Sequence, residues 1–300
     1  MKNFFIRFLF GLLLMGALLA GLFALTLTAI PTWGATRAED AKSLPGDELT
    51  SNPTLRWTNA ITVDVPPEKV WPWVAQIGDS RGGFYSYTFI ENKVGALTGA
   101  SDYQVVYTNA SVVHPEWQDP QPGDTLIDGS LKVREVEAGR YMLADSIQPS
   151  PFLWIWGWNL EPIENGSATR LIVRFTIEVP DTSGGNPVMN FMLNVGGFVM
   201  QQNMMQGIKL RAEGGSEPAW IESVEIALWL AAFVTAIAAA ILYLVRKDWR
   251  GPLAVAVSGV VGIFILTFVQ SLLMVRLLLD GALIAALVFV VRKQPGSQEA

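Results

Sequence analysis

The sequence predicts an α+β fold, in which a curved antiparallel sheet is covered by one long helix, joined to four membrane-spanning helices. Four long apolar runs, three of them after residue 220, indicate the spans. Between residues 55 and 179, short alternating segments separated by turn residues indicate antiparallel strands. An uninterrupted segment at residues 188–212 has the length of a helix that could lie across such a sheet.

The apolar runs cover residues 8–30, 224–245, 253–275 and 277–291. A hydrocarbon core of ~30 Å needs about 20 apolar residues, so each of the first three runs is long enough to cross it. The first run is longer than the apolar core of a signal peptide, and no clear cleavage site follows it. We therefore expect a retained anchor, with a cleaved signal peptide as the alternative.

Basic residues predict the orientation of the spans, because short cytoplasmic loops are rich in Lys and Arg. Seven cations fall on one side of a chain that crosses four times: Lys2, Arg7, Arg246, Lys247, Arg250, Arg292 and Lys293. We expect a multi-pass protein of the cell membrane with both termini in the cytoplasm and an extracytoplasmic domain.

The last two spans have no polar loop between them. The expected turn lies between Gln270 and Asp280, where the only breakers are found. Arg276 and Asp280 stand four residues apart, which places them on one helix face. They could form an ion pair at the outer membrane surface, or be functional charges inside the membrane.

Composition excludes several kinds of site. Residues 31–221 carry 13 Lys and Arg against 22 Asp and Glu, and this acidity argues against a nucleic-acid partner. The chain has no cysteine and a single histidine, His114, so thiolate chemistry and multi-histidine metal sites are impossible. We expect neither a metal nor a cofactor.

The segment between the spans has a clear order of elements. A strand at 55–65 precedes a helix at 67–77 and a shorter helix at 87–97. Strands then follow at 131–136, 141–147, 152–160 and 169–179, and the long helix closes the segment. The predicted parts are an N-terminal anchor (1–33), a linker (34–52), a folded domain (53–214), three spans (221–293) and a cytoplasmic tail (294–300).

Several motifs resemble those of a known superfamily. They are residues 61–77, which include Pro67 and Trp71 in a P-x-x-V-W helix, and residues 81–87, 115–118, 123–124 and 207–213. The chain resembles, over residues 53–213, the START/Bet v 1-like (SRPBCC) superfamily with its helix-grip fold, and in particular a bacterial membrane-anchored branch. This resemblance implies a cavity for a hydrophobic ligand but no particular chemistry, and it transfers no catalytic residue.

Aromatic and methionine side chains are the candidates for a ligand wall. No charge occurs from residue 182 to 208, where five of the nine methionines lie, and methionine adapts to irregular apolar shapes. Trp154, Trp156 and Trp158 alternate on one strand and so share a face, as a ligand wall, as core or as a membrane-facing stripe. The ligand-binding candidates are Tyr85, Tyr87, Trp117, Trp154, Trp156, Met192, Phe198, Met204 and Met205.

Polar residues nearby are candidates for contacts with a ligand. Arg81 precedes two glycines and several aromatics, a pattern that suits either a gate or a structural turn. The acid–base candidates are Glu91, His114, Glu116 and Asp145, although neither the reach nor the tuned pKa that catalysis needs is visible in a sequence. No G-x-S-x-G nucleophile motif is present.

The favoured function is non-catalytic binding of a lipid or another hydrophobic small molecule at a membrane. An enzyme acting on an apolar substrate, such as a cyclase or hydrolase, is one alternative, and it requires a buried titratable group facing the cavity. The other alternative is a structural or signalling module with a filled core, whose spans assemble with partners.

Overall fold

The computed structural model describes residues 2–97, 108–179, 187–218, 220–269 and 273–292. It divides into two compact units. The sheet unit comprises residues 26–217, and the helical unit comprises residues 1–25 and 218–300.

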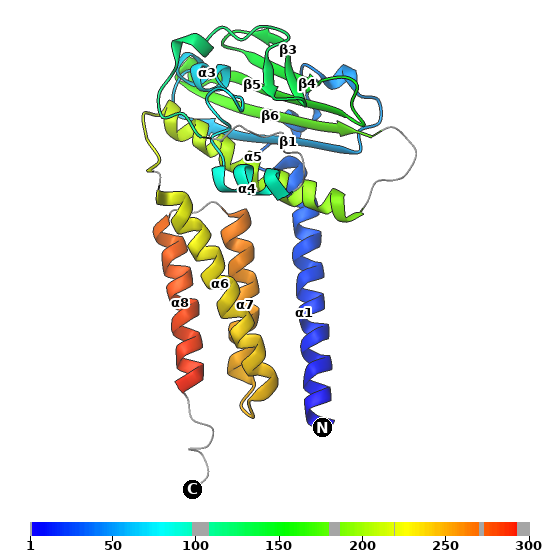
Figure 1. Cartoon of the computed structure of the whole chain (residues 1–300), viewed down its shortest axis with the longest axis vertical. Coiled ribbons are helices and arrows are strands. Elements are labelled where there is room, and N and C mark those ends of the chain that lie inside the picture. The colour runs from blue at the N-terminus through cyan, green and yellow to red at the C-terminus, as the bar shows by residue number, and fades with distance from the viewer. Residues whose placement is uncertain (1, 98–107, 180–186, 219, 270–272, 293–300) are drawn as a thin grey trace. The chain divides into compact units, whose positions relative to one another are not determined.

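In its described part, the sheet unit is built on six antiparallel strands in the order β1-β6-β5-β4-β3-β2 (Figure 1). The strands are β1 (Leu55–Val63), β2 (Thr125–Ile127), β3 (Leu131–Glu137), β4 (Tyr141–Ser146), β5 (Leu153–Ile163) and β6 (Ala168–Glu178). The turn between β3 and β4 contains Gly139 at φ 77°, and the turn between β5 and β6 contains Asn165 at φ 58°. Gly and Asn tolerate this left-handed conformation better than other residues, so both predicted hairpins form where the sequence places them.

Several helices accompany the sheet or precede it. They include α2 (Arg37–Ala41), α3 (Pro67–Ala75), α4 (Thr88–Leu97), α5 (Pro187–Ala212) and the 3₁₀ helix η1 (Ile30–Thr32). The long helix α5 and the short helix α3 pack on each other, and both contact strands of the sheet (Figure 1). The predicted α+β class with an antiparallel sheet is confirmed.

Strand alternation gives the sheet two distinct faces. The inner face, toward α5, carries Trp57 on β1 and its partner Phe175 on β6. The outer face carries the next positions, Thr58 and Arg174, which also pair in register. Successive side chains of a strand point to opposite faces, so one strand supplies both layers.

Residues 34–52 differ from the linker that the sequence suggested, because they cover the outer face. Thr36 and Glu39 form a capping box at the start of α2. Leu44, 5% exposed, packs with Ala60 and Ile172 on the sheet. The segment lacks an apolar period because most of its contacts are polar.

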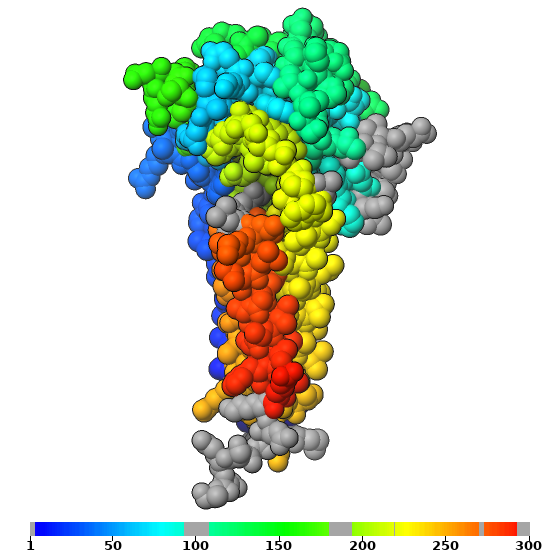
Figure 2. Space-filling view, turned by 90° about the vertical axis from the view of Figure 1, so that its left-hand side faces the viewer, coloured from blue at the N-terminus to red at the C-terminus, as the bar shows by residue number. Residues whose placement is uncertain are grey.

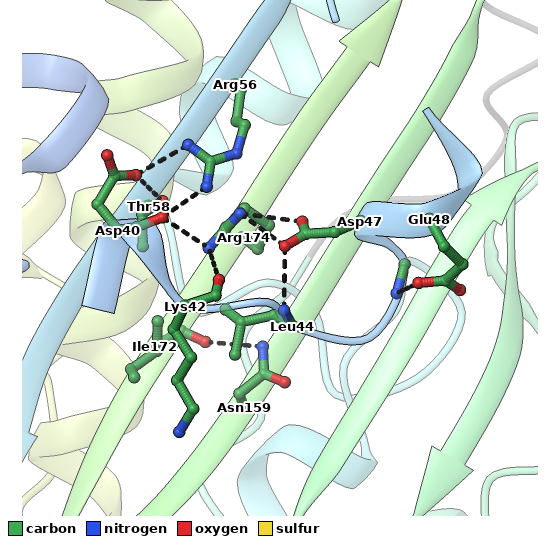
Figure 3. A network of polar contacts seen from close by, with 11 residues as sticks. Asp40, Lys42, Leu44, Asp47, Glu48, Arg56, Thr58, Asn159, Ile172 and Arg174 are labelled. Carbon is green, nitrogen blue, oxygen red and sulfur yellow. Dashed lines mark hydrogen bonds and ion pairs between the residues drawn. The ribbon is translucent and has the colours of Figure 1, made fainter. Parts of the chain in front are cut away.

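A network of polar contacts holds this cover in place (Figure 3). Arg174 donates from Nη1 to both carboxylate oxygens of Asp47, at 2.9 and 3.0 Å, and from Nη2 to the carbonyls of Asp40 and Lys42. The Asp40 carboxylate also accepts from Arg56 at 2.9 Å. One carboxylate and two backbone carbonyls therefore converge on one buried guanidinium.

Among its described residues, the helical unit contains four helices that are long and apolar enough to cross a membrane. They are α1 (Lys2–Ala29, of which residues 2–25 belong to this unit), α6 (Trp220–Val245), α7 (Arg250–Phe268) and α8 (Leu273–Arg292). Gly259 of α7 lies close to Ala236 of α6, and small residues of this kind let two helices approach. Figure 2 shows α8 (red) beside α6 (yellow), in agreement with their contacts.

Helix α7 ends at Phe268 and α8 begins at Leu273, so α8 starts within the interval that the sequence predicted for the turn. Arg276 and Asp280 therefore lie within α8 and are buried in the helical unit, at 6% and 3% exposure. They do not form the expected ion pair with each other, because Arg276 is paired with Glu225 of α6.

Candidate ligand-binding interior of the sheet unit

An aromatic layer covers the inner face of the sheet. Trp156 lies between Trp154 and Trp158, with ring centroids 5.7 and 4.6 Å away. Phe175 of β6 stacks on Trp57 at 4.6 Å and meets Trp156 edge-on at 5.9 Å. The structure thus places the three alternating tryptophans together, as their spacing on one strand predicted.

Helix α5 packs over this layer with apolar side chains. Phe198, Met204 and Met205 are at most 2% exposed. A Cβ atom at Gly197 would lie only 3.0 Å from the Trp57 ring, so the glycine allows the helix to approach the sheet closely. The side chain of Met192, another ligand-binding candidate, lies outside the described residues.

A chain of neutral hydrogen bonds crosses this interior. The indole N–H of Trp156 donates to Gln201 Oε1 at 3.1 Å, and Gln201 Nε2 donates to Asn59 Oδ1 at 2.5 Å. Asn59 Nδ2 donates to the carbonyl of Ile30 at 2.8 Å. The chain links β5, α5, β1 and η1, and each buried amide is used on both its oxygen and its nitrogen, as burial requires.

The sequence reasoning missed Asn59 and Gln201. A signal was present on β1, where Asn59 is the polar member of an inner series that otherwise contains Trp57, Ile61 and Val63. A single amide at an inward position of an apolar strand indicates a buried partner.

Two other indole groups in the layer behave differently. The Nε1 atoms of Trp154 and Trp158 are buried without an acceptor among the described residues. Trp158 is fully buried, whereas Trp154 is half-buried. A buried donor without an acceptor costs about 1–3 kcal/mol, so Trp154 and Trp158 are positions where an oxygen acceptor would stabilise the unit.

Tyr85, a ligand-wall candidate, is held tightly by protein groups. It is fully buried with φ at 55°, and its hydroxyl accepts from Gln76 Nε2 at 2.9 Å. The Arg211 guanidinium lies 4.9 Å above its ring, and burial raises the pKa of Tyr85 strongly. These contacts make Tyr85 part of the core, and the neighbouring candidate Tyr87 is buried as well.

Arg81 fixes a turn in the described structure. Its Nη2 donates to the carbonyls of Ala75 at 3.0 Å and Trp117 at 2.8 Å. Burial lowers the pKa of Arg81, and Asp124, at 3.8 Å, opposes this effect. The guanidinium thereby ties the end of α3 to the 3₁₀ helix η3 (Pro115–Trp117).

His114, Glu116 and Trp117 form a separate surface cluster. His114 Nδ1 lies 3.3 Å from Glu116 Oε1, and the imidazole ring is 4.3 Å from the Trp117 ring. The Glu116 side chain is 61% exposed, which leaves this pair open to solvent. Glu91 is half-buried on α4.

Asp145 lies on the outer face, away from the aromatic layer. It pairs in register with Lys132 and Ile155. Leu143, two residues earlier on the same strand, pairs with the outer-face residue Gly157, so Asp145 lies on the outer face as well. Arg134 donates to Asp145 at 2.6 Å, and both line a surface groove of about 430 Å³.

The inner positions of β1, β5 and β6 carry no acidic or basic side chain. The structure therefore does not bring Asp145 to the aromatic layer, where the enzymatic alternative would need a titratable group. What this part of the sheet offers to a ligand is aromatic surface and neutral hydrogen-bonding groups.

Comparisons with known proteins do not assign a family. No protein-family model matches the chain, and no curated protein matches it by sequence. Similar solved structures include a crystal structure from Thermus thermophilus, 14% identical over 53% of this chain and 97% of that one, with a TM-score of 0.21. A protein from Rhizobium leguminosarum is 11% identical over 53% of this chain and 95% of its own, with a TM-score of 0.23. At TM-scores this low, neither structure identifies the fold family.

Proposed function

We propose that the chain is a membrane-integral protein whose sheet unit binds a hydrophobic small molecule or lipid beside the aromatic layer. The observation that carries this proposal is the pair of buried indole donors, Trp154 and Trp158, that lack an acceptor among the described residues. They stand in a wall of aromatic rings that α5 covers with Phe198 and two methionines. Ligand sites are commonly apolar walls with a few polar groups that orient the ligand.

The chemistry of the wall defines the ligand class. Its body would be apolar, because aromatic and methionine side chains offer dispersion contacts and no charge. It would carry an oxygen acceptor, such as a carbonyl, ester or hydroxyl, to satisfy the half-buried indole of Trp154. Burial of ~300 Å² of apolar surface contributes several kcal/mol before the entropy of binding is subtracted.

The helical unit supports this function by keeping the sheet unit at a lipid reservoir. The distribution of Lys and Arg favours cytoplasmic termini and an extracytoplasmic sheet unit. A tether at a membrane raises the effective concentration of a ligand that partitions there. The resemblance to the START/Bet v 1-like superfamily, whose members enclose apolar ligands under a long helix, is consistent with this proposal.

The test uses the full chain in lipid nanodiscs with a fatty acid that carries a photoreactive diazirine on its tail. Cross-linked peptides are mapped by mass spectrometry. The proposal expects adducts on β5 and α5, and Trp154→Phe, which keeps an aromatic ring but loses the donor, should reduce their yield about fivefold, the effect of one hydrogen bond of ~1 kcal/mol.

The matched control is Trp220→Phe, an exposed tryptophan of the helical unit, which should leave the yield on β5 and α5 unchanged. Adducts confined to the apolar helices α1, α6, α7 and α8 would overturn the proposal. They would favour the filled-core module instead.

A further inference from the structure

Among the described residues of the helical unit, two ionisable side chains are buried and a third is largely buried. Glu225 lies on α6, and Arg276 and Asp280 lie on α8. The side chains of Arg276 and Glu225 are 6% and 13% exposed, and Asp280 is 3% exposed. The buried positions of α8 are Arg276, Asp280 and Leu283, which follow the spacing of a single helix face.

The guanidinium in this group is already engaged. Arg276 donates from Nη1 to Glu225 Oε1, which joins α8 to α6 through one ion pair. One positive charge is thereby matched to one negative charge. The second carboxylate in the group has no cation left to balance it.

Asp280 is that second carboxylate. Neither of its oxygens has a hydrogen-bond partner among the residues that the structure describes. In the described helices, residues 251–268 of α7 and 8–29 of α1 contain no ionisable side chain that could supply another cation. On α6 the remaining ionisable group in the same half is Glu222, which is also acidic.

An unpaired carboxylate in apolar surroundings is so costly that the group takes up a proton instead. With Asp280 protonated, the group of three is electrically neutral. With Asp280 ionised, two carboxylates would share one guanidinium. Arg276 lies one helix turn from Asp280, a spacing at which oppositely charged side chains can meet.

We propose that Asp280 is a proton-binding site inside the membrane helices, and that Arg276 is its alternative partner. The proton is held while Arg276 is paired with Glu225. When Asp280 releases the proton, its carboxylate competes for the same guanidinium, which weakens the link between α6 and α8. Proton uptake and helix contact are therefore coupled, independently of any ligand in the sheet unit.

Carbodiimide labelling tests the protonation state. Dicyclohexylcarbodiimide adds to protonated carboxyl groups in apolar surroundings and leaves a stable acylurea. The full chain in detergent is labelled and digested, and adducts are mapped by mass spectrometry. We expect an adduct at Asp280, a smaller one at Glu225, and a yield at Asp280 that falls as the pH rises. Asp280→Asn should abolish the adduct, and Glu222→Gln should leave it unchanged.

A second measurement remains informative if the reagent cannot reach the site. Thermal unfolding of the full chain is compared for the wild type and Asp280→Asn, at about pH 5 and about pH 9. A carboxyl that is protonated in the folded protein is mimicked by the neutral amide, so the two should unfold together at low pH. At high pH the wild type should unfold at the lower temperature. If Asp280→Asn is instead the less stable protein at both pH values, Asp280 is an ionised structural partner and the proposal fails.

The shared cation is tested with Glu225→Gln. This variant frees Arg276, which should then pair with an ionised Asp280 and reduce its carbodiimide adduct. An adduct at Asp280 that is unchanged in Glu225→Gln would show that Arg276 is not its alternative partner.

Discussion

Arg174, 1% exposed on the outer face of the sheet, donates to both carboxylate oxygens of Asp47, a residue 127 positions earlier in the chain. This contact fastens the segment at residues 34–52 to β6. Burial lowers the pKa of Arg174 and Asp47 opposes that effect, so the carboxylate stabilises a cation that is otherwise surrounded by protein.

Asp47→Ala should destabilise the sheet unit by about 3 kcal/mol, because it leaves a buried guanidinium without its anion. Chemical unfolding of the full chain, followed by tryptophan fluorescence, measures the loss. Glu48→Ala is the control, since among the described residues its carboxylate accepts one hydrogen bond, from the Gly46 backbone N–H at 3.1 Å. Equal losses in the two variants would contradict the role assigned to Asp47.

The lowered pKa of Glu39 in the folded protein makes the stability of the sheet unit depend on pH. The Arg170 guanidinium, which donates to Glu39 at 2.6 Å, lowers the pKa of Glu39 from 4.5 to about 2. Between pH 4.5 and about 2, the unfolded chain therefore binds more protons than the folded one. The contribution of ionised Glu39 to the free energy of unfolding is complete above pH 4.5 and is lost as the pH falls toward 2.

Glu39→Gln should therefore flatten the pH dependence of the urea midpoint between pH 4.5 and 2. The exposed Glu68 on α3 supplies the control, and Glu68→Gln should keep the slope of the wild type. A slope that survives in Glu39→Gln would assign the acid sensitivity to other carboxyls.

Gln201→Met tests the buried hydrogen-bond chain with little change of volume. It removes the acceptor of the Trp156 indole and the donor to Asn59, and each orphaned group costs about 1–3 kcal/mol. We expect a loss of several kcal/mol in unfolding experiments. Gln206→Met, at a half-buried position of the same helix, should cost much less. If the two variants were equally stable, the chain of amides would contribute nothing.

Two glycines of α5 give opposite expectations for the same substitution. A Cβ atom at Gly207 would lie 2.4 Å from the Tyr85 carbonyl oxygen, whereas one at Gly196 would meet nothing within 4 Å. Gly207→Ala should therefore cost about 1–3 kcal/mol through overpacking. Gly196→Ala should stabilise by up to ~1 kcal/mol, because alanine favours a helix interior. Thermal unfolding of the two variants measures both effects. A Gly207→Ala variant that is more stable than the wild type would refute the close approach of Gly207 to the Tyr85 carbonyl.

The strands and spans were predictable because their signals are local. Alternation on β5 placed three tryptophans on one face, and turn residues such as Gly139 and Asn165 marked the hairpins. Apolar runs marked the four long helices of the helical unit. Each of these patterns lies within about twenty consecutive residues.

The missed features depend on partners far away in the sequence. Glu39 and Asp47 look like linker residues until Arg170 and Arg174 lie beside them on β6. The same holds for Arg276, whose obvious partner by spacing is Asp280 but whose contact is Glu225 on another helix. Helical spacing limits which contacts are possible, and the tertiary fold determines which of them form.

The cover on the outer face has a consequence for the order of folding. Residues 34–49 leave the ribosome well before β6, yet their anchors, Arg170 and Arg174, lie on that strand. The cover cannot dock until nearly the whole sheet has been synthesised, and contacts between such distant segments form slowly. During that interval Leu44 and its partner Ala60 on β1 are open to water, and the nascent sheet presents a bare face that a chaperone can protect.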